Sequence, residues 1–115
     1  MADPIGTWDI NSNGFWEILS IQAIDPQGNL GESSVLSDHS DPILGFWDEG
    51  SQKITFMRLI NQNDPSTFQI FTGYLMVTQA DGSLALAGSF EAFQGTGATA
   101  QRVIYGWYAT PQVIQ

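Results

Sequence analysis

The tripeptide Gly6-Thr7-Trp8 and the run Gln101-Arg102-Val103-Ile104-Tyr105 decide the fold. Gly6 allows another backbone segment to approach closely, and Trp8 offers a large ring that can fill the closed end of a β-barrel. Arg102 lies in an otherwise apolar, strand-like run. It either stacks its guanidinium on the Trp8 indole or lies on an outer face as an ordinary surface arginine. The first alternative makes this pair the organising contact of a barrel.

The composition fits a single domain that spans residues 1–115. Hydrophobic residues make up 43% of the chain and include seven phenylalanines and four tryptophans, which argues against disorder. The net charge of −9 argues against nucleic acid and against anionic membranes as partners. The absence of cysteine excludes disulfides and thiolate chemistry.

The first residues indicate where the protein resides. Met1-Ala2-Asp3-Pro4 leads almost directly into the first predicted strand, without the basic and apolar regions of a signal peptide. No apolar run is long enough to cross a bilayer as a helix. We therefore expect a cytoplasmic protein, or a secreted one if a leader was removed.

Turn residues divide the chain into eight runs rich in β-branched and aromatic residues. The clearest turns are Asn11-Ser12-Asn13-Gly14, Asp25-Pro26-Gln27-Gly28-Asn29 and Asp81-Gly82. No stretch has a helical period, so the sequence predicts an all-β fold, an eight-stranded antiparallel up-and-down β-barrel, with a sandwich as the alternative. A barrel of eight strands can hold one small ligand. The predicted strands are residues 6–10, 15–24, 30–36, 43–47, 53–61, 67–78, 84–93 and 101–109.

Alternation along the last two strands separates an interior from an exterior. On the seventh strand the inward set is Leu84, Leu86, Gly88, Phe90 and Ala92. On the eighth strand, placing Arg102 inside requires that the alternate residues share its face, namely Ile104, Gly106 and Tyr108. The outer face then carries Val103, Tyr105 and Trp107.

Gly6-Thr7-Trp8 on the first strand with Arg102 on the last resembles the signature of the calycin superfamily of lipocalins and avidins, in which the arginine packs over the tryptophan. Within that superfamily the chain looks most like avidin and streptavidin. The turn at residues 25–29 and the stretch Phe71-Thr72-Gly73-Tyr74 are similar to theirs, and the resemblance covers most of the chain. It implies a non-enzymatic small-molecule-binding protein, with the ligand in the open end of the barrel and no cofactor or metal.

Most of the polar groups with which avidins hold biotin have no match here. Ile10 stands where avidins have an asparagine two residues after the tryptophan, and Asn11 substitutes only if the loop carries an insertion. The serine and acidic positions fall near Phe15 and on Gly106. Because unpaired polar atoms are costly to bury, we expect biotin binding to be lost. The positions that the resemblance gives as ligand contacts are Trp8, Asn11, Ser34, Leu59, Thr67, Gln69, Phe71, Phe90 and Tyr108.

In the register of that family, the later strands carry apolar side chains on the barrel exterior. Monomers rarely expose such a broad patch, so we expect a homo-oligomer, a dimer or a tetramer. The alternative is a register slip of one residue, which would exchange the two faces. The predicted interface residues are Ile54, Phe56, Ile60, Ile70, Tyr74, Met76, Val103, Tyr105 and Trp107.

Groups suited to catalysis are few. His39 lies between Asp38 and Asp41, which we interpret as a solvated loop rather than a metal or hydrolytic site. Glu17 either faces the cavity as a buried acid or lies on the surface. Three functions follow in order of preference: a small-molecule-binding protein, a structural or interaction protein that forms a homo-oligomer through the barrel exterior, and a calycin-like isomerase. For the isomerase, only Glu17 with Gln69 or Tyr108 offers a polar pair.

Overall fold

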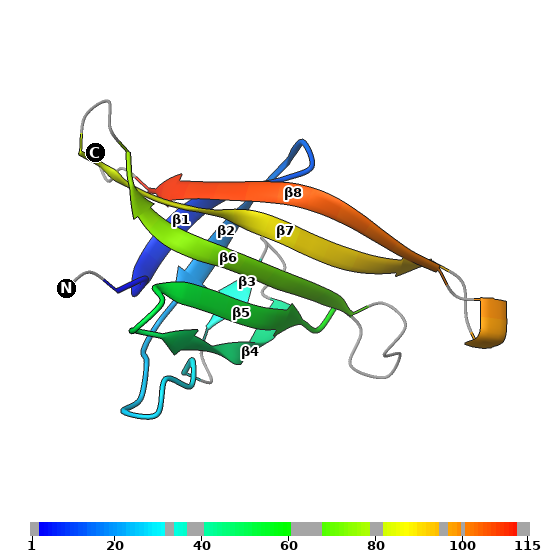
Figure 1. The fold of residues 1–115 in the computed structure, drawn as a ribbon, viewed down its shortest axis with the longest axis horizontal. Coiled ribbons are helices and arrows are strands. Elements are labelled where there is room, and N and C mark those ends of the chain that lie inside the picture. The colour runs from blue at the N-terminus through cyan, green and yellow to red at the C-terminus, as the bar shows by residue number, and fades with distance from the viewer. Residues whose placement is uncertain are drawn as a thin grey trace.

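The structure, a computed structural model, describes residues 3–31, 34–36, 41–60, 68–78, 82–94, 97–99 and 101–112. Its strands form a closed antiparallel barrel in which each strand pairs with the next and β8 pairs back with β1 (Figure 1). The strands are β1 (Gly6–Ser12), β2 (Phe15–Ile21), β3 (Val35–Leu36), β4 (Asp41–Asp48), β5 (Lys53–Arg58), β6 (Gln69–Val77), β7 (Leu84–Gln94) and β8 (Gln101–Pro111), with the 3-10 helix η2 (Gly97–Thr99) before β8. The predicted up-and-down barrel is confirmed, and the sandwich is excluded.

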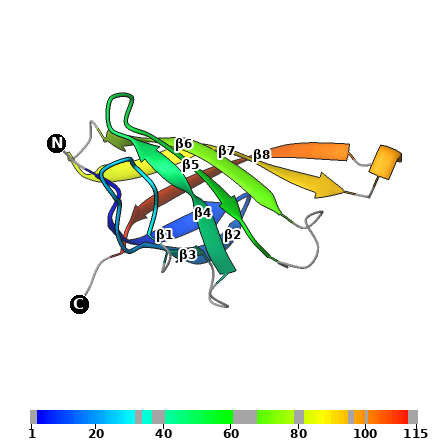
Figure 2. The same ribbon diagram turned by 90° about the horizontal axis from the view of Figure 1, so that it is seen from below.

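The two ends of the barrel differ. β1 begins at one end, here called the N-terminal end, and β1, β3, β5 and β7 all finish at the other, here called the open end. At the open end the β7–β8 hairpin continues past the other strands (Figures 1 and 2). Within the described part of the chain, no helix is long and apolar enough to cross a membrane.

The turn between β1 and β2 is tighter than the sequence predicts. Asn13 and Gly14 both have positive φ, 52° and 93°, as a two-residue hairpin of the primed type requires. Ser12 pairs directly with Phe15, so β1 runs to Ser12 instead of ending at Ile10. Ser12 is thereby placed in the barrel wall.

The predicted turn at residues 25–29 is confirmed. Gly28 N donates to Asp25 O (2.9 Å), and Gly28 adopts φ +92° against the Trp47 carbonyl, where a Cβ would lie 2.3 Å from the oxygen. The side chain and backbone N–H of Asn29 donate to the Asp25 carboxylate and lower the pKa of Asp25, with smaller contributions from Gln27 and Gly28. Of the third strand, predicted from residue 30, the described residues include Val35–Leu36, and Leu30 lies outside it in an isolated bridge with Ile24.

Aromatic residues of four neighbouring strands form one row across the inside of the barrel, here called the aromatic row. Phe56, Phe71, Phe90 and Tyr105 are successive cross-strand partners on β5 to β8. Phe71 stacks between Phe56 and Phe90, with ring centroids 4.8 and 4.7 Å apart, and Phe90 lies 5.4 Å from Tyr105. Aromatic pairs at these separations add to the stabilisation from apolar burial.

The predicted faces of the fifth and eighth strands are wrong by one residue. Ile54, Phe56 and Trp107 are buried, while Arg102, Ile104 and Tyr108 are exposed. Burial of Trp107 explains the register: its Nε1 donates to the carbonyls of Thr72 and Ser89, and its ring lies where a Cβ on Gly73 would be 2.5 Å away. A one-residue shift exchanges all side chains between the faces.

The expected Trp8–Arg102 contact is therefore absent. Trp8 is buried near the N-terminal end and its Nε1 donates to Pro4 O (2.9 Å). The Arg102 side chain is 62% exposed and pairs with Glu91 on the barrel exterior (3.1 Å). Arg102 is the surface arginine of the alternative interpretation. On β7 the predicted alternation is correct, because Leu86 and Phe90 are buried and Ser89 is exposed.

Candidate ligand-binding site

Strand pairing brings polar side chains together inside the barrel at its open end. On β5, Arg58 follows Ile54 and Phe56 on the inward face, and its cross-strand partners are Ile43 and Gln69. Glu17 alternates with the buried Leu19 on β2, and Asp41 alternates with the buried Ile43 on β4. Four strands thus direct polar groups into one layer above the aromatic row.

Arg58 is the centre of this layer. Its Nη1 and Nη2 donate to the two carboxylate oxygens of Glu17 (3.0 and 2.8 Å). Its Nε donates to Asp41 Oδ2 (3.0 Å), Nη2 lies 3.0 Å from the same oxygen, and Nη1 also donates to Gln69 Oε1 (3.3 Å). Four of the five N–H groups of the guanidinium thus donate hydrogen bonds. The Arg58 side chain is only 11% exposed, so the pairing compensates a charge largely removed from water.

A cavity of about 250 Å3 lies beside this layer. Glu17, Arg58 and Gln69 contribute its polar wall, and Phe90, Ala92 and Tyr105 contribute an apolar one. Ser12 also lines the cavity; it is 5% exposed, and its Oγ is the one buried side-chain polar atom among the described residues that has no hydrogen-bond partner. Buried polar atoms normally have hydrogen-bond partners, so we expect a bound ligand or a water to hydrogen-bond with this hydroxyl.

The structure distributes the predicted ligand contacts over three environments. Gln69 and Phe90 line the open-end cavity. Trp8 and Phe71 lie in the core, and Ser34 is fully buried with its Oγ accepting from Gln22 N (3.1 Å).

The other predicted contacts lie away from the cavity. Asn11 caps its own turn by accepting from Gly14 N (2.8 Å), Leu59 is half-buried beyond the end of β5, and Tyr108 is exposed with its ring 5.8 Å from that of Trp16. Thr67, Asp38 and His39 lie outside the described residues.

The polar pair considered for an isomerase is only partly assembled. Glu17 and Gln69 both contact Arg58 and share the cavity, whereas Tyr108 points outward. No group of three or more metal-binding side chains occurs within the described ranges. The layer is an arrangement of charged and hydrogen-bonding groups held by Arg58.

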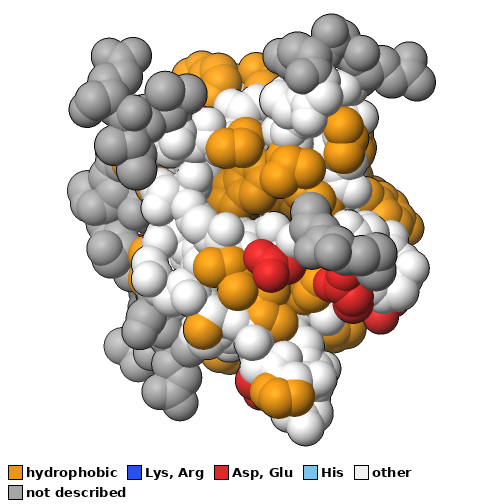
Figure 3. Space-filling view, turned by 90° about the vertical axis from the view of Figure 1, so that its left-hand side faces the viewer, with side chains coloured by type: hydrophobic (Ala, Val, Ile, Leu, Met, Phe, Trp, Pro, Cys, Tyr) orange, Lys and Arg blue, Asp and Glu red, His pale blue; other side chains and the backbone are white. Residues whose placement is uncertain are grey.

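A second hollow, of about 370 Å3, lies at the N-terminal end. Figure 3 looks onto this end and shows hydrophobic side chains around its centre, with acidic ones beside them and no lysine or arginine in view. In the hollow, Trp47 Nε1 donates to Glu49 Oε2 (2.7 Å) and Asp3 Oδ1 accepts from Ile5 N (3.0 Å).

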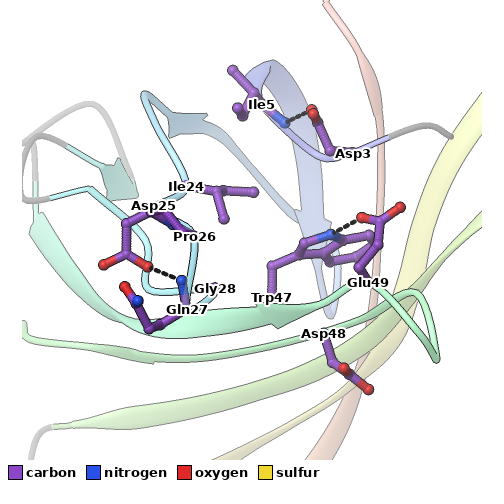
Figure 4. A pocket seen from close by; sticks show the side chains of 10 residues that line it. All are labelled: Asp3, Ile5, Ile24, Asp25, Pro26, Gln27, Gly28, Trp47, Asp48 and Glu49. Atoms are coloured by element: carbon purple, nitrogen blue, oxygen red, sulfur yellow. Dashed lines mark hydrogen bonds between the residues drawn. The ribbon is translucent and has the colours of Figure 1, made fainter.

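The carboxylates of Asp25 and Asp48 point away from Trp47 in this hollow (Figure 4). The Asp48 carboxylate accepts from Ser51 Oγ, which lowers the pKa of Asp48. Ser12, whose buried Oγ has no hydrogen-bond partner, lines the open-end cavity and not this hollow, and we therefore prefer the open end as the ligand site.

Comparison with known proteins supports the fold. No protein-family model and no curated protein matches the chain. Among solved structures the chain is similar to a low-affinity mutant of shwanavidin, a protein of the avidin/streptavidin family, with a TM-score of 0.63 over 96% of this chain and 97% of the other, at 14% sequence identity. Together with the closed eight-stranded antiparallel barrel, this likeness shows that the protein has an avidin-like fold.

Proposed function

We propose that this protein is a non-enzymatic small-molecule-binding protein that takes its ligand in the open-end cavity and does not bind biotin. The observation that supports it most directly is the unpartnered Ser12 hydroxyl, buried in the wall of a cavity that also holds fixed charged groups. Ligand sites typically combine an apolar wall with a few well-placed polar groups, as this cavity does. An avidin-like barrel is a fold that suits such a role.

The filled interior of the barrel supports the loss of biotin binding. Ile10, at the position where avidins place an asparagine, is fully buried and apolar. Phe56 and Phe71 occupy the space below the cavity and are 1% and 0% exposed. A ureido group placed in this region would lose its hydrating water without gaining hydrogen-bond partners. That loss costs about 2–7 kcal/mol for each unpaired polar group.

A fragment screen by two-dimensional amide NMR tests the proposal. We expect fragments that bind to shift the amide signals of Ser12, Gln69 and Tyr105, and biotin to shift none. The variant Ala92→Leu fills the cavity and should abolish the shifts. Ala87→Leu, on the outward face of the same strand, is the matched control and should retain them. Fragments that bind equally well to both variants, or biotin shifts at these amides, would contradict the proposal.

Homo-oligomer formation through the exterior is a second candidate function, supported by the exposed face of β6 to β8. Tyr74 and Met76 on β6 and Ile104 and Tyr108 on β8 are between 43% and 62% exposed. Tyr74 and Tyr108 are both cross-strand partners of Ala87, so they belong to one continuous surface. Apolar surfaces of this kind commonly mark protein contacts. The buried Ile54, Phe56 and Trp107 do not belong to it.

Native mass spectrometry distinguishes this candidate. We expect an oligomer that dissociates in Ile104→Glu, because the substitution places a charge on the apolar face. Thr7→Glu, also on an exposed outer position but on β1, should leave the oligomer intact. A wild-type protein that is monomeric at micromolar concentration would exclude this second function.

A further inference from the structure

The charge balance of the open-end cavity identifies the class of its ligand. Resting on the function proposed above, we infer that the cavity takes a small organic cation, an aromatic or alkyl primary amine, and excludes carboxylates. The inference depends on three features: the engagement of Arg58 by Glu17, Asp41 and Gln69, the acceptor capacity that remains around it, and the lack of another lysine or arginine near the cavity.

Arg58 cannot serve as an anion receptor. Four of its five N–H groups donate to Glu17, Asp41 or Gln69 at N···O distances between 2.8 and 3.3 Å, and Nη2 also lies 3.0 Å from Asp41 Oδ2 as an ion pair. A ligand carboxylate would have to displace Gln69 or compete with Glu17 and Asp41, and in either case it would add a third negative charge beside one guanidinium, which is unfavourable. The bidentate geometry makes competition with Glu17 harder still.

Two carboxylates face one guanidinium, so the layer carries a formal charge of −1. Each Glu17 oxygen accepts one hydrogen bond from Arg58 and retains further acceptor capacity. The Glu17 side chain is 21% exposed and lines the cavity, so an ammonium can reach it. Ser12 lines the same cavity, and its buried, unpartnered Oγ becomes a second acceptor when the side chain turns toward the cavity. These groups match the three donors of a primary ammonium.

The chain holds only three lysine and arginine residues, and the structure describes all of them. Lys53 lies at the start of β5 with its Nζ 5.9 Å from the Tyr74 ring centroid, far from the open end, and Arg102 is paired with Glu91 outside the barrel. Apart from Arg58, no lysine or arginine is therefore near enough to offset the negative charge of the layer. The net charge of −9 further raises the local concentration of cations.

The apolar wall accounts for the rest of the ligand. Phe90 and Tyr105 present aromatic surface to the cavity, and an aromatic or alkyl group can pack against them while its ammonium lies near Glu17. Attraction between the cation and the aromatic rings adds to this placement. A cavity of about 250 Å3 is suited to a ligand of single-ring size.

Three isosteric probes test the inference by isothermal titration calorimetry: benzylamine, benzyl alcohol and benzoate. We expect benzylamine to bind roughly tenfold more tightly than benzyl alcohol, because only the ammonium brings a positive charge that attracts the net negative layer. Benzoate should not bind. Glu17→Gln should remove the preference for the amine, and Glu91→Gln, which alters a carboxylate on the barrel exterior, should keep it.

Salt dependence gives a second readout that does not require Glu17→Gln to fold. The affinity for benzylamine should fall as ionic strength rises, while that for benzyl alcohol stays constant. Benzyl alcohol or benzoate binding as tightly as the amine would overturn the inference and leave the binding function standing. If none of the three probes binds the wild type more tightly than it binds Ala92→Leu, the inference is overturned. If the fragment screen also finds no binder, the proposed binding function is wrong as well.

Discussion

At the scale of single residues, the buried ion pairs of Arg58 differ in kind from the exposed pair of Arg102. The Arg58 side chain is 11% exposed and that of Arg102 is 62% exposed. Breaking a buried pair leaves an unpaired charge out of water, whereas a surface pair is screened by solvent. Stability and cavity chemistry therefore both depend on Arg58.

Arg58→Met should destabilise the protein by about 3–5 kcal/mol, because Glu17 and Asp41 would lose their counter-ion in a largely buried layer. The measurement is the free energy of unfolding in urea. Arg102→Met is the matched control and should cost at most about 1 kcal/mol. Equal losses in the two variants would refute the buried layer.

Two buried serines allow a direct test of the unpartnered hydroxyl. Ser12→Ala should leave the unfolding free energy unchanged or raise it by up to about 1 kcal/mol, since no hydrogen bond is lost. Ser34→Ala removes the acceptor of Gln22 N and should cost about 1–2 kcal/mol. Thermal unfolding of both variants decides the matter, and a marked loss in Ser12→Ala would mean that its Oγ has a partner.

At the scale of elements, the turn at residues 25–29 depends on the ionised form of one exposed carboxylate. The side chain and backbone of Asn29 donate to Asp25 and lower its pKa below the ordinary value of 3.8. A group whose pKa is lowered by folding stabilises the folded state above its unfolded pKa. That stabilisation is lost as the pH falls through the folded-state pKa.

Asp25→Ala should accordingly be less stable than the wild type near pH 7, and the difference should shrink below pH 3.8. Urea unfolding across this range measures it. Asn29→Ala removes the largest contribution to the shift, so combining it with Asp25→Ala should add little further loss. A difference that stays constant down to the lowest pH would show that the carboxylate charge is irrelevant to the turn.

At the scale of the whole molecule, the aromatic row joins β5, β6, β7 and β8 across the barrel interior. Phe71 has ring contacts with Phe56, Phe90 and Trp107, and it is fully buried. Removing its ring leaves a void in contact with three strands, which the surrounding barrel can fill only in part.

Phe71→Ala should therefore destabilise the barrel by about 3–5 kcal/mol, as measured by chemical denaturation. Phe15→Ala removes the same group from a side chain that is 72% exposed and should change stability by no more than about 0.5 kcal/mol. A small effect at Phe71 would mean that the row does not hold these strands together.

The sequence predicted the strands well because turn residues act locally. Asp25-Pro26-Gln27-Gly28-Asn29 encodes its own hydrogen bonds, and the barrel follows from short connections between eight strands. Which side chains of a strand point into the barrel depends instead on contacts between residues far apart in the sequence. Placing Arg102 inside forced Trp107 outward, although a tryptophan is the costlier of the two to leave in water.

The one-residue shift predicted for β5 also places Arg58, the centre of the candidate site, on the outer face. Ile54, Phe56 and Arg58 alternate on β5, so turning the two apolar residues inward also turns Arg58 inward. That alternation was the available signal. No local pattern indicates that Glu17 and Asp41 meet Arg58, because their strands come together only when the barrel closes.

The pairing of β1 with β8 also determines where new chain termini can be placed in this protein. Gln112 N donates to Thr7 O (2.9 Å), so the two ends of the ladder meet. A short linker from residue 112 to residue 3 could therefore join them while keeping Pro4, whose carbonyl accepts from Trp8 Nε1. New termini between Gly50 and Ser51, both exposed in the turn between β4 and β5, would leave every strand uncut. The barrel should thus accept circular permutation, with its fusion points moved away from β1 and β8.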